Sequence, residues 1–110
     1  MLEIDPISSE GTRDIAISLA GDLETGETIS SVTVTSGNET VLGITNVAVN
    51  VAPISYKNVT AAIGEAVLFR ITGLLAGACW RGEITLDFTG NQGSKDCYRI
   101  RINVKDKLTE

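Results

Sequence analysis

Alternation of apolar and polar residues is clearest in the last third of the chain. Over residues 78–88 the even-numbered positions carry most of the apolar side chains and the odd-numbered positions the polar ones, and residues 98–104 repeat the pattern. A period of two is typical of a strand with one buried face. The loop T-G-N-Q-G-S lies between the two runs. Two alternating strands around such a loop predict a β-hairpin.

The register of this hairpin can be predicted from its side chains. The apolar faces coincide only if the numbers of paired residues sum to an even value, because a slip by one residue would invert every side chain. Among such registers, one places Glu83 opposite Arg99 and Asp87 opposite Lys95. We expect this register because both are pairs of opposite charge.

Earlier segments show the same alternation or a variant of it. The predicted core-facing sets are Ile15, Ile17 and Leu19 in one strand, Ile29, Val32 and Val34 in the next, Val47, Val49 and Val51 in a third that ends before Pro53, and Val67, Phe69 and Ile71 in a fourth. The change from odd to even positions after Ile29 predicts a β-bulge near Ser30 and Ser31. Residues 54–64 read as one irregular strand, and A-A-I-G-E-A within this region could form a short helical turn.

Composition supports a β-rich domain with an aliphatic core. The chain has 110 residues, 43% of them hydrophobic and 5% aromatic, with 11 glycines scattered between runs of Val, Ile and Thr. Such residues fit pleated, half-buried surfaces. We therefore predict an all-β protein, an immunoglobulin-like β-sandwich of about seven antiparallel strands. Residues 1–12 are expected to form an arm or edge segment, residues 13–106 the sandwich and residues 107–110 a C-terminal tail.

Charge and residue usage argue against several function classes. The net charge of −5 disfavours binding to nucleic acid, which requires clustered Lys and Arg. The chain contains no histidine, which removes the commonest general base and metal ligand. Its apolar runs are too short to span a membrane, and the N-terminus lacks the basic and apolar regions of a secretory signal. We expect no cofactor, no catalytic residue and no metal ligand, and synthesis in a cytosol.

The two cysteines could form either a disulfide or two free thiols. In the expected hairpin Cys79 lies opposite about residue 103, roughly 20 Å from Cys97 at ~3.3 Å per residue. This favours free thiols, although another topology could bring the two together. A nucleophilic cysteine needs a base or a cationic setting. Arg81 and Arg99 are close in sequence, but no histidine is available.

Acidic residues and the single tryptophan offer the remaining candidate sites. In G-D-L-E-T-G-E, residues Asp22, Glu24 and Glu27 have the spacing of some calcium loops but lack the rest of that motif, which favours a solvated turn. Asp87 and Asp96 flank one end of the hairpin, where a turn explains them. Trp80 shares the apolar face of its strand. Packing in the core is therefore favoured over an exposed platform for a sugar ring.

Several of these stretches resemble one protein family. They are the early Asp5-Pro6, the run G-E-T-I-S-S-V-T-V, the run T-G-L-L-A-G followed three residues later by an aromatic, and the closing R-I-R-I-N-V-K-D. From Asp5 to Asp106 the chain resembles the small immunoglobulin-like proteins encoded among the virion genes of tailed bacteriophages. That family commonly reads Gly-Gly-x-Ala-Gly-x-x-Tyr where this chain has Gly73, Ala76, Gly77 and, in place of the tyrosine, Trp80. The family's aromatic pair in the first two strands is absent, since Ile17, Leu19, Val32 and Val34 stand there.

The resemblance implies a non-enzymatic structural protein of the virion, assembled in the host cytoplasm. Its expected role is an adaptor that links head or tail to the receptor-binding fibres, or alternatively a capsid decoration protein. Its expected partners are other virion proteins and further copies of itself, with no nucleic acid and no membrane. The resemblance carries no functional residue over. Residues 1–12 are expected to order only on assembly, so that their deletion would spare the fold. A carbohydrate-binding module and a small enzyme are the alternatives from other classes.

Overall fold

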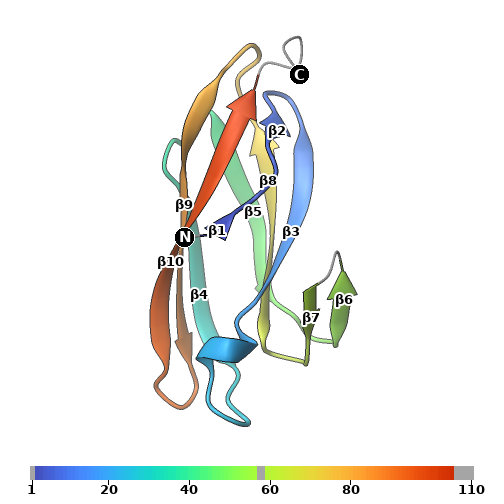
Figure 1. Cartoon of the computed structure of the whole chain (residues 1–110), viewed down its shortest axis with the longest axis vertical. Helices are drawn as coiled ribbons and strands as arrows, with labels where there is room; N and C mark the ends of the chain where they lie inside the picture. Colours follow the sequence, from blue (N-terminus) through green and yellow to red (C-terminus); the bar gives the residue numbers. More distant parts are fainter. Residues whose placement is uncertain (1, 57–58, 106–110) are drawn as a thin grey trace.

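Nearly all of the regular secondary structure in the described residues is β-strand. The computed structural model describes residues 2–56 and 59–105, with all elements drawn in Figure 1. Its strands are β1 (Leu2–Glu3), β2 (Ile7–Ser8), β3 (Thr12–Ser18), β4 (Ile29–Ser36), β5 (Leu42–Val49), β6 (Ile54–Tyr56), β7 (Val59–Ala61), β8 (Ala66–Gly73), β9 (Trp80–Gly90) and β10 (Lys95–Lys105). A short 3₁₀ helix, η1 (Ala20–Asp22), follows β3.

Two sheets pack face to face. The first has the order β4-β9-β10, with β1 and β2 both running parallel to β10 along its outer side. The second has the antiparallel order β3-β8-β5, and β6 and β7 form a separate small hairpin. The order β4-β9-β10 matches the CFG sheet of an immunoglobulin-like sandwich, and the order β3-β8-β5 matches its BED sheet. The predicted all-β, immunoglobulin-like sandwich is therefore confirmed.

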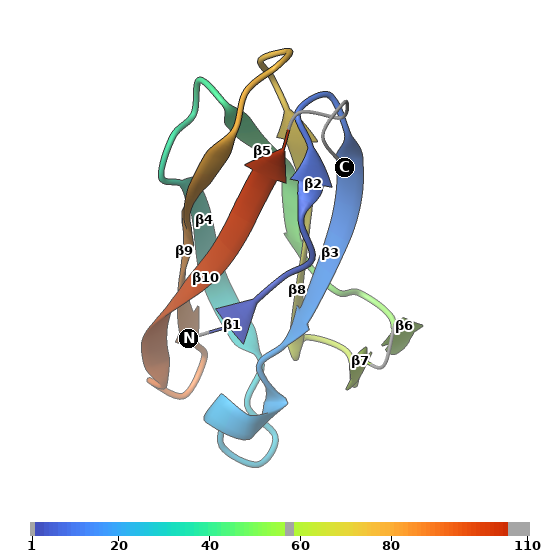
Figure 2. The same ribbon diagram turned by 45° about the horizontal axis from the view of Figure 1, so that its top comes forward.

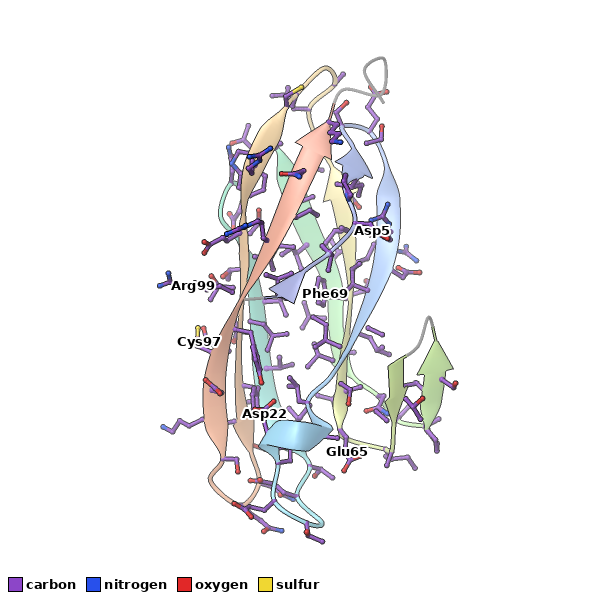
Figure 3. All side chains as sticks on the ribbon, viewed as in Figure 1. Asp5, Asp22, Glu65, Phe69, Cys97 and Arg99 are labelled. Carbon is purple, nitrogen blue, oxygen red and sulfur yellow. The ribbon has the colours of Figure 1, made fainter. Side chains whose placement is uncertain are left out.

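The core is aliphatic and lies between the two sheets. Phe69 points into this space, whereas Cys97 and Arg99 point away from it (Figure 3). The buried side chains from the two sheets include Val67, Phe69, Ile71, Ile84, Leu86, Phe88, Ile100, Ile102 and Val104. They occupy alternate positions of three strands, so the core faces predicted for β8, β9 and β10 are confirmed.

The terminal hairpin forms as predicted but in a different register. Glu83 lies opposite Arg101 rather than Arg99, and Asp87 lies opposite Cys97 rather than Lys95. The numbers of paired residues still sum to an even value, so every apolar side chain stays on the predicted face of the hairpin. The turn is centred one residue later than predicted because Gly93 takes a left-handed φ of 98° and the Gly90 amide donates to the Ser94 carbonyl at 2.6 Å.

The bulge predicted near Ser30 and Ser31 is confirmed by a register shift between Ile29 and Ser31. The core face predicted for residues 47–51 is confirmed only at Val49, which lies opposite Val67 and packs against the core. Val47 falls in a second bulge, where the register shifts between Thr45 and Ala48 and Asn46 has a φ of 56°. β5 ends at Val49, so Val51 lies beyond the strand and is 89% exposed, whereas Asn50 is only 3% exposed.

Asn50 is buried because its amide joins three loop segments. Its Nδ2 donates to the carbonyls of Ala52 at 2.9 Å and Ala62 at 2.8 Å, and its Oδ1 accepts from the Ala66 amide at 3.0 Å. A fully bonded amide can be buried at little cost. The single irregular strand expected over residues 54–64 is instead the β6–β7 hairpin, whose residues 57 and 58 lie outside the described part. The expected helical turn is a tight turn at Ile63 and Gly64.

The N-terminal segment belongs to the sandwich and is not a free arm. Ile7, 2% exposed, lies opposite Val104 in the parallel pairing of β2 with β10. Ile4 and Ser9 donate backbone hydrogen bonds to β10 as well. Residues 2–9 pack as edge strands within the single chain, which agrees with the edge segment expected there and differs from an arm that orders only on assembly. The predicted C-terminal tail, residues 107–110, lies outside the described residues.

Candidate functional site

The two cysteines are free thiols, as the hairpin geometry favoured. Both are exposed and neither forms a disulfide. Cys97 lies opposite Asp87, whose carboxylate accepts a hydrogen bond from the thiol and raises its pKa, with burial acting in the same direction. A raised pKa keeps the thiol protonated, which is opposite to what a nucleophile needs. Asp96 accepts a hydrogen bond from the Cys97 amide at 2.8 Å, so this aspartate supports the strand locally.

The acidic side chains of the loop after β3 point to different partners. Asp22 accepts a hydrogen bond from the Tyr98 hydroxyl, and Glu24 is exposed. Glu27, which the sequence placed in a solvated turn, has no exposed surface. Its carboxylate turns inward toward the loop of the terminal hairpin. The three acidic side chains therefore have separate partners and do not converge on one point.

Glu27 holds two loops together through one carboxylate. Its Oε1 accepts from the Glu24 amide at 2.8 Å, and its Oε2 accepts from the amides of Gln92 at 2.8 Å and Ser94 at 3.1 Å. A side-chain hydrogen bond from Ser94 is the main cause that lowers the pKa of Glu27 to about 2, and these backbone bonds add to it while burial opposes them. An anion bound by amide donors inside a fold is stabilised in its charged form. This carboxylate is a structural clamp.

Trp80 packs against the edge of the core, as predicted, but remains half-buried. Its ring lies over Gly82, where an added Cβ would approach the indole to 2.1 Å. Gly37 contacts the same ring from the β4–β5 loop, at 3.4 Å from a built Cβ. The indole thus covers two glycine backbones. Its remaining surface borders a shallow hollow that is also lined by Cys79, Arg81, Asn103, Val104 and Lys105.

We expect Gly82→Ala to expose Trp80 and to destabilise the fold. The new methyl group would occupy the space of the indole, and overpacking of this kind costs about 1–3 kcal/mol. Urea unfolding would measure the loss, and a shift of tryptophan emission to longer wavelength would report the displaced ring. Gly21→Ala is the matched control, because nothing lies within 4 Å of a Cβ at Gly21. Equal stability and emission in both variants would contradict this placement of the indole.

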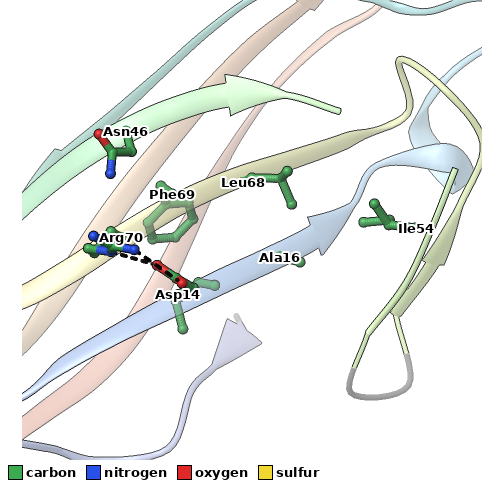
Figure 4. Close-up of a pocket in the computed structure, with 8 residues that line it drawn as sticks. Asp14, Ala16, Asn46, Ile54, Leu68, Phe69 and Arg70 are labelled. Atoms are coloured by element: carbon green, nitrogen blue, oxygen red, sulfur yellow. Dashed lines mark hydrogen bonds and ion pairs between the residues drawn. The ribbon is translucent and has the colours of Figure 1, made fainter. Parts of the chain in front are cut away.

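A groove crosses the outer face of the β3-β8-β5 sheet beside the β6–β7 hairpin (Figure 4). It has a volume of about 390 Å³, with Ala16, Leu68 and Ile54 among its apolar lining residues. Arg70 and Asp14 form an ion pair at its polar end, with Nε to Oδ1 at 2.8 Å, and the bonded guanidinium lowers the pKa of Asp14. The two charges neutralise each other, so the groove offers no unpaired charge from this pair to a ligand.

Among the side chains that the structure describes, the most exposed large aliphatic ones lie at the two ends of the sandwich. Leu74 and Leu75 follow the C-terminal end of β8 and are 53% and 48% exposed. Ile63 precedes the other end of β8 at 55% exposure, and Val51 follows β5, which runs antiparallel to β8, at 89%. The molecule measures 46 × 23 × 22 Å, and the strands run along its length (Figure 1). Apolar contact points therefore lie at opposite ends of an elongated body.

The comparisons with known proteins add no identity. No protein-family model matches the chain, and no curated protein matches it. Within residues 2–56 and 59–105, acidic and cysteine side chains form no group of three or more suited to a metal ion. In the same part of the chain, no helix has the length and hydrophobicity needed to cross a membrane.

Proposed function

We propose that this protein is a non-enzymatic structural protein of a tailed-bacteriophage virion, an adaptor that links head or tail to the receptor-binding fibres. The observation that carries the proposal is the placement of exposed aliphatic side chains at both ends of the sandwich. Contacts at two ends let one subunit join two neighbours, which is what an adaptor does. The resemblance of residues 5–106 to virion-encoded immunoglobulin-like proteins supports the same role.

Hydrogen bonds hold the backbone of the loops that carry these side chains. The carbonyls of Ala52 and Ala62, next to Val51 and Ile63, are both bound by the buried Asn50 amide. At the other end, Leu74 packs across Gly43, and its amide donates to the Val41 carbonyl at 2.9 Å. A loop whose backbone is already held in place loses less entropy on binding, which favours specific docking.

We expect Leu75→Ser and Ile63→Ser each to reduce incorporation into particles by about tenfold or more while leaving the fold intact, since each removes an apolar anchor from one end. The readout is quantitative mass spectrometry of purified particles assembled with each variant. Ala76→Ser and Ala62→Ser are matched controls, because both alanines are exposed neighbours of the replaced residues.

Two outcomes would contradict the proposal. One is absence of the protein from purified particles, and the other is normal incorporation of both serine variants. The copy number separates the two virion roles. Roughly a dozen copies per particle fit an adaptor at a tail vertex, whereas copies in the hundreds fit capsid decoration. Binding of glycans through Trp80, with no particle association, would indicate a carbohydrate-binding module instead.

A further inference from the structure

The two long sides of the sandwich are closed to different degrees. On one side, β1 and β2 cover the outer edge of β10 (Figure 2). Arg13 of β3 ties this segment to the second sheet by donating to the carbonyls of Asp5 at 2.7 Å and Pro6 at 2.8 Å. The N-terminal segment thus spans both sheets and occupies the edge between them. Covering an edge strand is a common way to prevent pairing with another chain.

The opposite side is formed by the edges of β4 and β5. In the described part of the chain, β4 pairs only with β9 and β5 only with β8. The two edge strands belong to different sheets and lie next to each other (Figure 1). An edge strand directs alternate backbone N–H and C=O groups outward. The N-terminal side has one unpaired edge, because β3 pairs only with β8 in the same part of the chain, but β3 carries the charged residues Arg13 and Asp14. The side formed by β4 and β5 therefore offers two unpaired strand edges.

The same side is almost free of charge. Of 9 basic and 14 acidic residues in the chain, only Glu39 lies between Thr28 and Tyr56. The exposed positions of β4 are Ser30, Ser31, Thr33 and Thr35, and those of β5 include the apolar Val47, at 37% exposure, and Ala48. Monomeric β-proteins usually guard an edge with lysine, another charge or proline. Neither β4 nor β5 contains any of these.

β4 is better suited than β5 to accept another strand. The bulge of β4 lies at its start, so residues 31–36 keep a continuous register with β9. The bulge of β5 lies in its middle, between Thr45 and Ala48, and breaks the line of outward backbone groups. Residues 31–36 of β4, which we call the β4 edge, therefore form the longer regular template.

We propose that the β4 edge pairs antiparallel with the β4 edge of a second copy of this chain, joining two β4-β9-β10 sheets into one. The edge is self-complementary, which points to a second copy as the partner. Each chain carries a net charge of −5, so two copies can meet only through a surface that carries little charge. The β4 edge carries no charge, and a two-fold axis through it would place Ser and Thr side chains opposite one another, pairs that stabilise antiparallel sheets.

This inference deepens the proposed function, because it names the surface through which copies of the protein meet. The exposed aliphatic side chains at the two ends stay available for other virion proteins. The two ideas use different residues, so they can fail separately.

The test measures self-association of the purified chain. We expect sedimentation equilibrium to show a dimer, about twice the chain mass of 11.6 kDa. Thr33→Lys should raise the dimer dissociation constant by at least about tenfold, because each copy would then bring a lysine to the uncharged edge. Thr12→Lys adds the same charge to an exposed threonine of β3 on the opposite side and should leave the constant unchanged. Circular dichroism of both variants confirms that they fold.

Cross-linking defines the register of the pairing. In a Cys79→Ser, Cys97→Ser background, we would place single cysteines at Ser31, Thr33 and Thr35 and oxidise them. A covalent dimer should form most readily at the position closest to the two-fold axis, and Thr12→Cys should form none. A wild-type chain that stays monomeric up to about 1 mM overturns the proposal, as does a Thr33→Lys variant that associates like the wild type. Either result would leave the virion role intact, since that role is tested by incorporation into particles.

Discussion

We expect Glu27→Gln to lower the midpoint of thermal unfolding by roughly 10 °C at neutral pH. The carboxylate of Glu27 accepts hydrogen bonds from the amides of Glu24, Gln92 and Ser94. A glutamine has only one accepting oxygen, so its NH₂ group would face at least one of these backbone donors. Buried donors left without an acceptor destabilise a fold by their full desolvation cost. Circular dichroism melts would measure the change.

Acidification should reproduce this loss in the wild-type protein. The pKa of Glu27 is about 2 in the folded state against an ordinary value of 4.5. Protons therefore bind the unfolded chain more readily between these two values. The stability contributed by this carboxylate is fully present above about pH 4.5 and is lost as the pH falls toward 2. The difference in midpoint between the wild type and Glu27→Gln should accordingly shrink across that window.

Glu24→Gln is the matched control for the loop. Glu24 is exposed and contributes its backbone amide, not its side chain, to the clamp. The Glu24→Gln protein should melt within about 1 °C of the wild type. A Glu27→Gln variant that melts like this control, or a midpoint difference that stays constant down to pH 2, would show that Glu27 is not the clamp.

The second large effect is expected at Ile7. Replacement by alanine should reduce the free energy of unfolding by about 2–5 kcal/mol, since it deletes most of a buried side chain and leaves a cavity. Ile7 is 2% exposed and belongs to the main core cluster. Deletion of residues 1–9 should be more damaging still, because it also removes the strand pairing that covers the edge of β10. Urea unfolding would measure both effects.

Ile63→Ala provides the comparison for Ile7, because it removes the same atoms from a side chain that is 55% exposed. It should cost far less than Ile7→Ala. If the chain without residues 1–9 unfolds at the same urea concentration as the full chain, this segment does not stabilise the sandwich. It would then be better described as an arm that orders on assembly.

The sequence predicts the fold wherever the alternation is strong. The faces of β8, β9 and β10 could be read from single residues such as Phe69 and Leu86, because each of these strands buries one face against the other sheet. The β4 bulge was also readable, since the apolar set changes parity after Ile29. These are local signals, and they depend only on which side of a strand meets water.

The errors arise where distant segments decide the outcome. Asn46 takes a left-handed conformation in the middle of β5, and nothing in the run of valines around it indicates this bulge or the end of the strand at Val49, after which Val51 is exposed. Asn50 and Glu27 are buried because backbone groups from other loops satisfy them, and such partners cannot be located from local sequence. Ile7 sits in a polar stretch, and its burial depends on β10, which is almost the full length of the chain away.

The parallel pairing of β1 and β2 with β10 also has a mechanical consequence. If neighbours pull on the two chain ends in opposite directions, the segments around Leu2 and Lys105 are drawn along their common axis. Parallel neighbours then slide past each other, so the hydrogen bonds from Ile4 to Arg101 and from Ser9 to Lys105 carry the load together rather than opening one at a time. The first and last strands of the sandwich thus act as a shear joint that resists tension applied through the termini.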